Sequence, residues 1–122
     1  MSRFSEIVDH AKSRIQEQTV EQVKARIDQG ESFALIDVRE DREWVTAHAS
    51  GAIHVGKGVL ERDIEKAVPD TATPVVLYCG GGSRSALAAE SLQRMGYTQV
   101  VSMIGGFGGW KSAGYPVRAG DE

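Results

Sequence analysis

The hydrophobic residues of this chain fall into short uninterrupted runs separated by longer segments of mixed polarity. Residues 75–78 and 100–104 are almost wholly apolar and rich in β-branched side chains, and 33–38 is similar apart from one aspartate. Runs of this length without an alternating polar face are typical of strands buried on both sides of a sheet. Residues 53–55 are predicted as a further short strand. The pattern therefore predicts a sheet of mostly parallel strands.

Between these runs, apolar residues recur at the three- and four-residue spacing of amphipathic helices. One such helix is predicted over 4–16 and another over 59–68. A third is predicted to begin after Thr19, which can form a capping box with Gln22. Because strands and helices alternate, we expect a single α/β domain with a mostly parallel central sheet flanked by helices.

The predicted helix at the N-terminus precedes the rest of the pattern and divides the chain. We interpret 1–18 as an N-terminal helical extension, 19–118 as one domain and 119–122 as a tail. The apolar stripe of this extra amphipathic helix has to be covered. We expect it to pack on its own domain in a monomer rather than to form a dimer contact, with a weak homodimer left open.

The only cysteine, Cys79, lies where an apolar run meets a glycine-rich loop. Glycines allow successive backbone N–H groups to turn inward around a negative charge. Helix-forming residues follow, so a helix is predicted to begin at Ser85 with its positive end toward the loop. This setting favours the thiolate of Cys79 over the thiol, and the thiolate is the nucleophile. The residues expected to hold an anionic substrate are Gly80, Gly81, Gly82, Ser83, Arg84 and Ser85.

Composition limits the classes of function. The chain has 122 residues, 41% of them hydrophobic, which suits one globular domain. A net charge of −3 without a long basic run indicates neither nucleic acid nor an anionic membrane as a partner. One cysteine excludes an intramolecular disulfide and a multi-cysteine metal site, and we expect no metal and no cofactor. A free thiol, with no signal-like apolar run at the start, indicates a cytoplasmic protein.

Three blocks of sequence, in order, resemble the pattern of rhodanese-like sulfurtransferases. The segment CGGGSRS at 79–85 is similar to the active-site loop of that family. Residues 35–40, LIDVRE, precede it, and 114–117, GYPV, follow it. Residues 47–50, AHAS, depart from the family, in which Gly, His, Ile and Pro are usual. The resemblance extends over about residues 20 to 117, and its remaining matches are Glu43, Trp44, His48, the GAIH of 51–54, Gly105, Gly106 and Trp110.

The resemblance implies a sulfurtransferase without a cofactor. Cys79 would take a sulfane sulfur from a small anionic donor such as thiosulfate, become a persulfide, and pass the sulfur to cyanide, a thiol or a protein. N–H groups from Gly80 to Ser85 would stabilise the persulfide and the departing sulfite, and Ser83 and Arg84 would orient the anion.

Outside the loop we expect structural roles. The resemblance places Asp37 and Arg39 in a charged network that holds neighbouring loops together. His48 and His54 are interpreted as structural histidines and Trp44 as a packing aromatic. The glycines between 105 and 109 are interpreted as a structural turn, because they lack the fingerprint of a phosphate-binding loop.

Two alternatives remain at this point. Cysteine phosphatases and arsenate reductases also use a cysteine and an arginine in an anion-binding loop, but Cys79 and Arg84 have the spacing C-x4-R, whereas the phosphatases resemble C-x5-R. One residue fewer makes a smaller loop, which suits a sulfur atom better than a phosphate. The other alternative is a persulfide carrier that serves a protein partner and turns over free substrates poorly.

Overall fold

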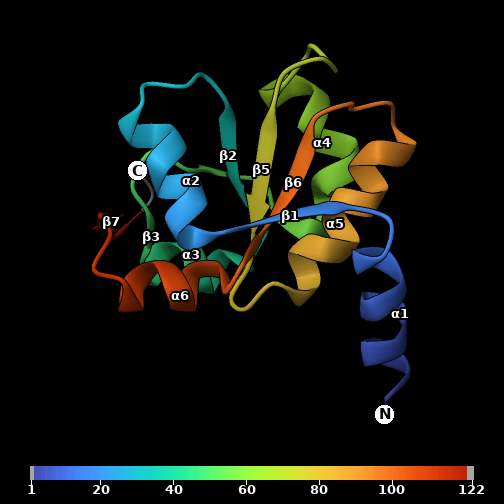
Figure 1. Ribbon diagram of the computed structural model, residues 1–122, viewed down its shortest axis with the longest axis horizontal. Coiled ribbons are helices and arrows are strands. Elements are labelled where there is room, and N and C mark those ends of the chain that lie inside the picture. Colours follow the sequence, from blue (N-terminus) through green and yellow to red (C-terminus); the bar gives the residue numbers. More distant parts are fainter. Residues whose placement is uncertain (1, 121–122) are drawn as a thin grey trace.

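The computed structural model describes residues 2–120, which form an α/β domain around a parallel sheet of five strands (Figure 1). The strand order is β1-β6-β5-β2-β4, so β5 lies at the centre. A separate antiparallel pair joins β3 and β7. The strands are β1 (Gln16–Thr19), β2 (Ala34–Asp37), β3 (His48–Ala49), β4 (Ile53–His54), β5 (Val75–Tyr78), β6 (Val100–Ile104) and β7 (Val117–Arg118).

Helices cover both faces of the sheet and bury its apolar side chains. Side chains from α4 and α5 pack with Val75 and Leu77 of β5 on one face, whereas α2 and α6 pack with Val76 and Tyr78 on the other. This alternation along β5 is the two-residue period of a strand buried on both sides. The helices are α1 (Arg3–Lys12), α2 (Val20–Asp28), α3 (Asp41–Thr46), the 3-10 turn η1 (Lys57–Val59), α4 (Leu60–Ala67), α5 (Ser83–Arg94) and α6 (Gly106–Ser112).

The predicted strands at the centre of the sheet are confirmed, but β1 was not predicted. Its sequence, QEQT, has no apolar residue, and it lies at the edge of the sheet, where it pairs with β6 by backbone hydrogen bonds. The prediction of one helix over 4–16 was wrong at its end, because α1 ends at Lys12 and β1 begins at Gln16. Helix α5 begins at Ser83, two residues earlier than predicted.

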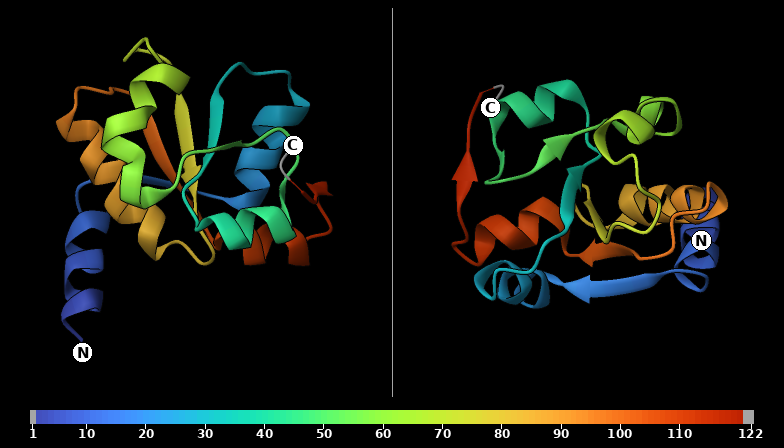
Figure 2. Two further views of the ribbon diagram at one scale, coloured as in Figure 1. Left: turned by 180° about the vertical axis from the view of Figure 1, so that it is seen from behind. Right: turned by 90° about the horizontal axis from the view of Figure 1, so that it is seen from above.

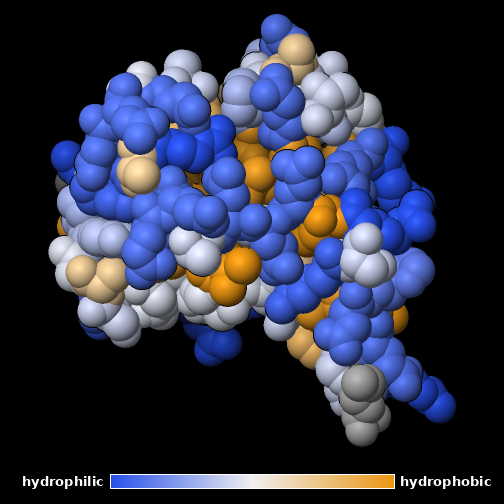
Figure 3. All heavy atoms as spheres, viewed as in Figure 1, coloured by the Kyte–Doolittle hydropathy of each residue, from blue (hydrophilic) through white to orange (hydrophobic). Residues whose placement is uncertain are grey.

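The extra N-terminal helix is present and packs against α5 through Val8 and Ala11, which are buried. Phe4 and Ile7, at its start, are 52% and 54% exposed. The N-terminal end of α1 projects from the body of the domain (Figures 2 and 3). Its apolar stripe is therefore only partly covered by its own domain, and the oligomeric state stays a prediction.

The segment after α6 is paired rather than loose as far as Gly120. Strand β7 pairs with β3, and the backbone N–H of Gly120 donates to the carbonyl oxygen of Val45 at 2.8 Å. The last part of the predicted tail, 121–122, lies outside the described residues. Within residues 2–120, no helix has both the length and the apolar character to cross a membrane.

Candidate active site

Cys79 follows directly after the central strand β5, at the edge of the sheet where the parallel strands end. The next turn leads into α5 through Gly82, whose φ of 113° is strained for any residue with a side chain. This turn aims the backbone N–H of Gly82 at Cys79 Sγ, 3.1 Å away. The cysteine is 1% exposed. The sulfur therefore lies within the loop, as the sequence predicted.

The pKa of Cys79 results from opposing effects. Burial raises it, but hydrogen bonds from the Ser85 hydroxyl and from the N–H groups of Ser85, Gly82 and Gly81 favour the thiolate, and together they hold the pKa below its ordinary value. The donors are fixed by the turn and by the start of α5. The geometry therefore stabilises negative charge on Sγ.

The hydroxyl of Ser85 is held by a second buried serine. Ser85 Oγ lies 3.5 Å from Cys79 Sγ and 2.8 Å from Oγ of Ser102, and both serines are fully buried. If the Ser102 hydroxyl donates to Ser85, the Ser85 proton is free to point at the thiolate. Sequence reasoning missed Ser102. The available signal was one hydroxyl in the otherwise apolar run of β6.

Arg84 is held beside the loop by an ion pair, with its Nη2 3.1 Å from the place that a side-chain carbon on Gly80 would take. Its Nη1 lies 2.8 Å from Oε1 of Glu43 and its Nη2 lies 3.1 Å from Oε2, which makes a two-pronged ion pair. The hydrogen bonds from Arg84, against some desolvation, lower the pKa of Glu43 to about 2. The orientation of an anion by Arg84 thus stays a prediction that requires this ion pair to open. Ser83 begins α5 beside it.

The glycines of α6 let that helix pack directly on the backbone of the loop. A side-chain carbon added to Gly106 would lie 2.5 Å from the carbonyl oxygen of Cys79. The N–H of Phe107 donates to that oxygen at 2.7 Å, and the N–H of Gly108 donates to the carbonyl oxygen of Gly80 at 3.1 Å. The predicted close approach of backbone to backbone is present, but the glycines begin helix α6 rather than forming a turn, and this helix start contacts the loop.

A buried ion pair links the neighbouring loops. Arg39 donates from Nε and Nη2 to the carboxylate of Asp37, and from Nη2 to the carbonyl oxygen of Ala47 at 2.6 Å. Asp37 is fully buried and Arg39 is 5% exposed. The Arg39 guanidinium also lies 4.3 Å from the centre of the Phe107 ring. The predicted structural network of Asp37 and Arg39 is therefore confirmed.

The two histidines belong to the same framework. His48 stacks on Trp44 with ring centres 3.4 Å apart, and its Nδ1 hydrogen bonds with the Trp44 carbonyl oxygen at 2.9 Å. Nε2 of His54 lies 2.8 Å from the carbonyl oxygen of Arg39. These contacts agree with the structural roles predicted for all three aromatic side chains.

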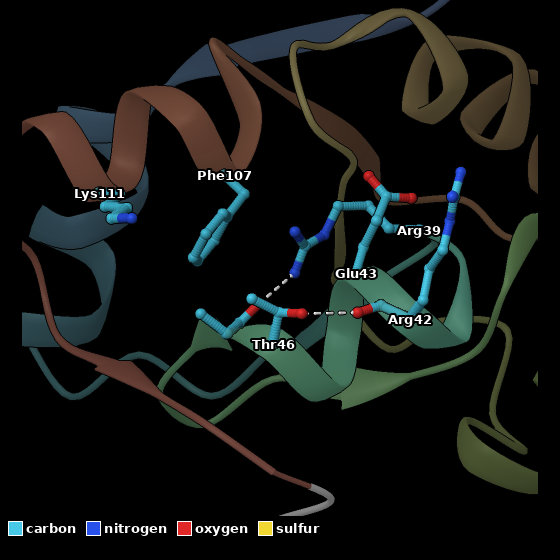
Figure 4. Close-up of a pocket in the computed structure, with 7 residues that line it drawn as sticks. Arg39, Arg42, Glu43, Thr46, Phe107 and Lys111 are labelled. Carbon is cyan, nitrogen blue, oxygen red and sulfur yellow. Dashed lines mark hydrogen bonds between the residues drawn. The ribbon is translucent and has the colours of Figure 1, made fainter.

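A pocket of about 400 Å³ opens next to the loop, between α3 and α6 (Figure 4). It shares Phe107 and Glu43 with the surroundings of Cys79 described above. Groups of three or more potential metal ligands do not occur within residues 2–120. The residues that line the pocket are Arg39, Arg42, Glu43, Thr46, Ala47, Phe107 and Lys111.

The sequence model of the rhodanese-like domain matches residues 19–113. This chain belongs to the rhodanese-like domain family. Among its rhodanese-like relatives, the thiosulfate sulfurtransferase GlpE of Coxiella burnetii is 36% identical over 80 residues, which are 66% of this chain and 73% of that protein. The proposed sulfur carrier protein YrkF of Bacillus subtilis is 30% identical over 98 residues, 80% of this chain. The match spans about half of YrkF, 52% of its length.

A solved structure from Rhodopseudomonas palustris superposes with a TM-score of 0.83 at 31% identity, covering 97% of this chain and 96% of that one. It is described as a protein of unknown function and a possible tyrosine phosphatase. Of the two relatives named above, one is a thiosulfate sulfurtransferase and the other a proposed sulfur carrier, so family membership supports sulfur transfer as the general function.

Proposed function

We propose that this protein is a sulfurtransferase that carries sulfane sulfur on Cys79. In the first half-reaction, the Cys79 thiolate attacks the outer sulfur of a donor such as thiosulfate. The new bond to Sγ forms as the sulfur–sulfur bond of the donor breaks, and sulfite departs with the electron pair of that bond. Cys79 is left as a persulfide anion, surrounded by the N–H groups of the loop.

In the second half-reaction, a thiophilic acceptor such as cyanide, a thiol or a protein thiol attacks the terminal sulfur. The bond between that sulfur and Cys79 Sγ breaks, and its electron pair returns to Sγ as a thiolate. The proposal includes no metal or other cofactor. A cytoplasmic location, which the single free thiol suggests, is part of the same proposal.

The observation that carries the proposal is the set of donors around one sulfur atom. The Gly82 N–H and the Ser85 hydroxyl both face Sγ, and they hold the pKa of Cys79 below its ordinary value. A buried cysteine with a purely packing role needs no such donors, and burial alone would raise its pKa.

Steady-state formation of thiocyanate from thiosulfate and cyanide tests the proposal. The parent protein is expected to turn over, whereas Cys79→Ser is expected to lose the activity and keep the fold, as judged by its unfolding curve. Thiocyanate formation by Cys79→Ser at the parental rate would overturn the mechanism.

A persulfide carrier is the second candidate, and the similarity to YrkF favours it. A carrier would load sulfur on Cys79 but release it only to a protein partner. Slow turnover with cyanide, together with rapid loading of sulfur on Cys79, would support the carrier. Rapid turnover with both small substrates would support the enzyme.

A cysteine phosphatase is less favoured by the site. The loop has the short C-x4-R spacing, and the arginine that would face a phosphate forms an ion pair with Glu43 instead. We expect no Cys79-dependent hydrolysis of p-nitrophenyl phosphate. Hydrolysis that is present in the parent and absent in Cys79→Ser would favour the phosphatase or a related enzyme.

A further inference from the structure

The pocket between α3 and α6 is larger than the proposed donor requires. Its volume of about 400 Å³ lies in the range of sites for organic molecules, roughly 300 to 1,000 Å³. Thiosulfate has only a handful of heavy atoms and would fill a small part of it. The pocket therefore suits an organic molecule, and its lining indicates which kind.

A buried cation lines the pocket and has a donor to spare. Arg39 uses Nε and Nη2 for Asp37 and for the backbone of Ala47, but its Nη1 has no hydrogen-bond partner within residues 2–120. The side chain is held on both sides, by Asp37 and by the ring of Phe107. A fixed guanidinium with a free N–H edge is a preformed donor for a carboxylate.

Two further cations lie at the sides of the pocket. Arg42 comes from α3 and Lys111 from α6, and neither has an ion-pair partner in the described part of the chain. Glu43, the acid in the lining, pairs with Arg84, and Asp37 pairs with Arg39, so that Arg39, Arg42 and Lys111 outnumber the acids of the lining. The pocket therefore carries a net positive charge and favours an anion.

The rest of the lining is apolar. The ring of Phe107 points into the space between the two helices (Figure 4), and Ala47 and the methyl group of Thr46 lie on the α3 side. An inorganic anion gains nothing from such a wall, whereas the carbon skeleton of an organic anion is partly removed from water there.

The pocket adjoins the loop that holds the reactive sulfur. Phe107, in its wall, donates its backbone N–H to the carbonyl oxygen of Cys79 at 2.7 Å. Glu43, also in its wall, holds Arg84 of the loop. Phe107 and Glu43 therefore line the pocket and also contact the loop, so that a molecule in the pocket lies one residue away from the loop.

From these observations we propose that the pocket binds the carboxylate and carbon skeleton of an organic thiol, which is the acceptor of sulfur from Cys79. The inference rests on the proposed function for the transfer step. There the Cys79 persulfide anion first takes up a proton from water, and the bound thiolate then attacks its terminal sulfur. A sulfur–sulfur bond forms on the acceptor, the proton stays on the transferred sulfur, and the electron pair of the broken bond returns to Cys79 Sγ.

A matched pair of acceptors tests the proposal: N-acetylcysteine and its amide, which differ only in the carboxylate. The measured quantity is kcat/KM for the acid divided by kcat/KM for the amide, with thiosulfate as donor. In the double variant Arg42→Gln/Lys111→Gln, we expect this ratio to fall about fivefold to tenfold relative to the parent, since exposed charge pairs are individually weak. An unchanged ratio would overturn the proposal.

Arg94→Gln is the matched control. Arg94 is an exposed cation that forms no ion pair with any of residues 2–120, and it lies in the last turn of α5, about 16 Å along the helix from the loop. The ratio is expected to equal that of the parent. A fall as large as in the double variant would show that total charge, rather than the pocket, selects the acceptor.

A binding measurement separates this inference from the proposed function. N-acetylmethionine and its amide have no thiol, and their binding can be followed by the NMR signals of the Phe107 ring. Binding of the acid in preference to the amide, weakened in the double variant, supports carboxylate binding in the pocket even if no sulfur is transferred and the proposed function fails. Equal binding of acid and amide, or no binding of either, overturns carboxylate binding in the pocket whatever the sulfurtransferase activity.

Discussion

Arg84 and Glu43, 41 residues apart in sequence, form a two-pronged ion pair, in which Nη1 and Nη2 of Arg84 lie 2.8 and 3.1 Å from Oε1 and Oε2 of Glu43. The pair joins the start of α5 to α3 and holds the guanidinium beside Gly80 of the loop. The cation that follows the loop is therefore engaged before a substrate arrives. We therefore expect Arg84 to hold an anionic donor only when this pair opens.

Removal of the charge on Glu43 is expected to release Arg84 toward the donor. In Glu43→Gln, the guanidinium has only a neutral partner, so we expect KM for thiosulfate to fall about threefold, whereas Arg84→Ala raises it. Initial rates at varied thiosulfate and saturating cyanide measure both effects. A KM that is unchanged in both variants would mean that Arg84 never reaches the donor.

The same pair makes stability depend on pH. The pKa of Glu43 is depressed from 4.5 to about 2, so the folded state binds this proton less readily than the unfolded state does. The stabilisation is complete above 4.5 and is lost as pH falls toward 2. Urea unfolding between pH 2 and 6 should show a smaller loss of stability for Glu43→Gln than for the parent. Glu61→Gln, an exposed residue of α4, should follow the parent; identical curves for all three would contradict the account.

The two buried serines are expected to lower the pKa of the Cys79 thiol, Ser85 by direct contact with Sγ and Ser102 through its hydrogen bond with Ser85. Ser85→Ala removes a hydroxyl donor to Sγ, so the pKa of Cys79 rises and alkylation by iodoacetamide at pH 7 slows about tenfold. Ser102→Ala leaves that donor but frees its orientation, so a smaller slowing is expected. Ser91→Ala, on the same helix, is the control. Equal rates in all four proteins would show that the serines do not act on the sulfur.

Gly106→Ala tests the packing of α6 on the loop. The added carbon would lie 2.5 Å from the Cys79 carbonyl oxygen, at a φ of 55°. The added carbon would meet backbone atoms of Cys79 and Gly80, which cannot move aside as a flexible side chain can. We therefore expect the free energy of unfolding to fall by about 2 to 3 kcal/mol. Gly58→Ala, which meets nothing within 4 Å, should leave it nearly unchanged. Denaturant unfolding gives both values, and equal stabilities would refute this role of Gly106.

The centre of the fold could be predicted from the sequence because the responsible interactions are local or strongly apolar. The runs that form β5 and β6 leave few alternatives, and the glycines after Cys79 fix where the chain turns. Strand β1 could not be predicted, since its polar QEQT is held by the backbone of β6 rather than by its side chains. Pairings between distant residues, such as Arg84 with Glu43, leave no pattern in a single sequence.

The intact mass of the protein after incubation with thiosulfate, and again after addition of cyanide, tests the central claim most directly. A thiolate at Cys79 that accepts sulfane sulfur predicts a gain of one sulfur atom, about 32 Da, which cyanide removes and which Cys79→Ser does not show. A gain of the same mass in Cys79→Ser, or turnover of thiosulfate to thiocyanate without any such species on the parent protein, would contradict the persulfide on Cys79.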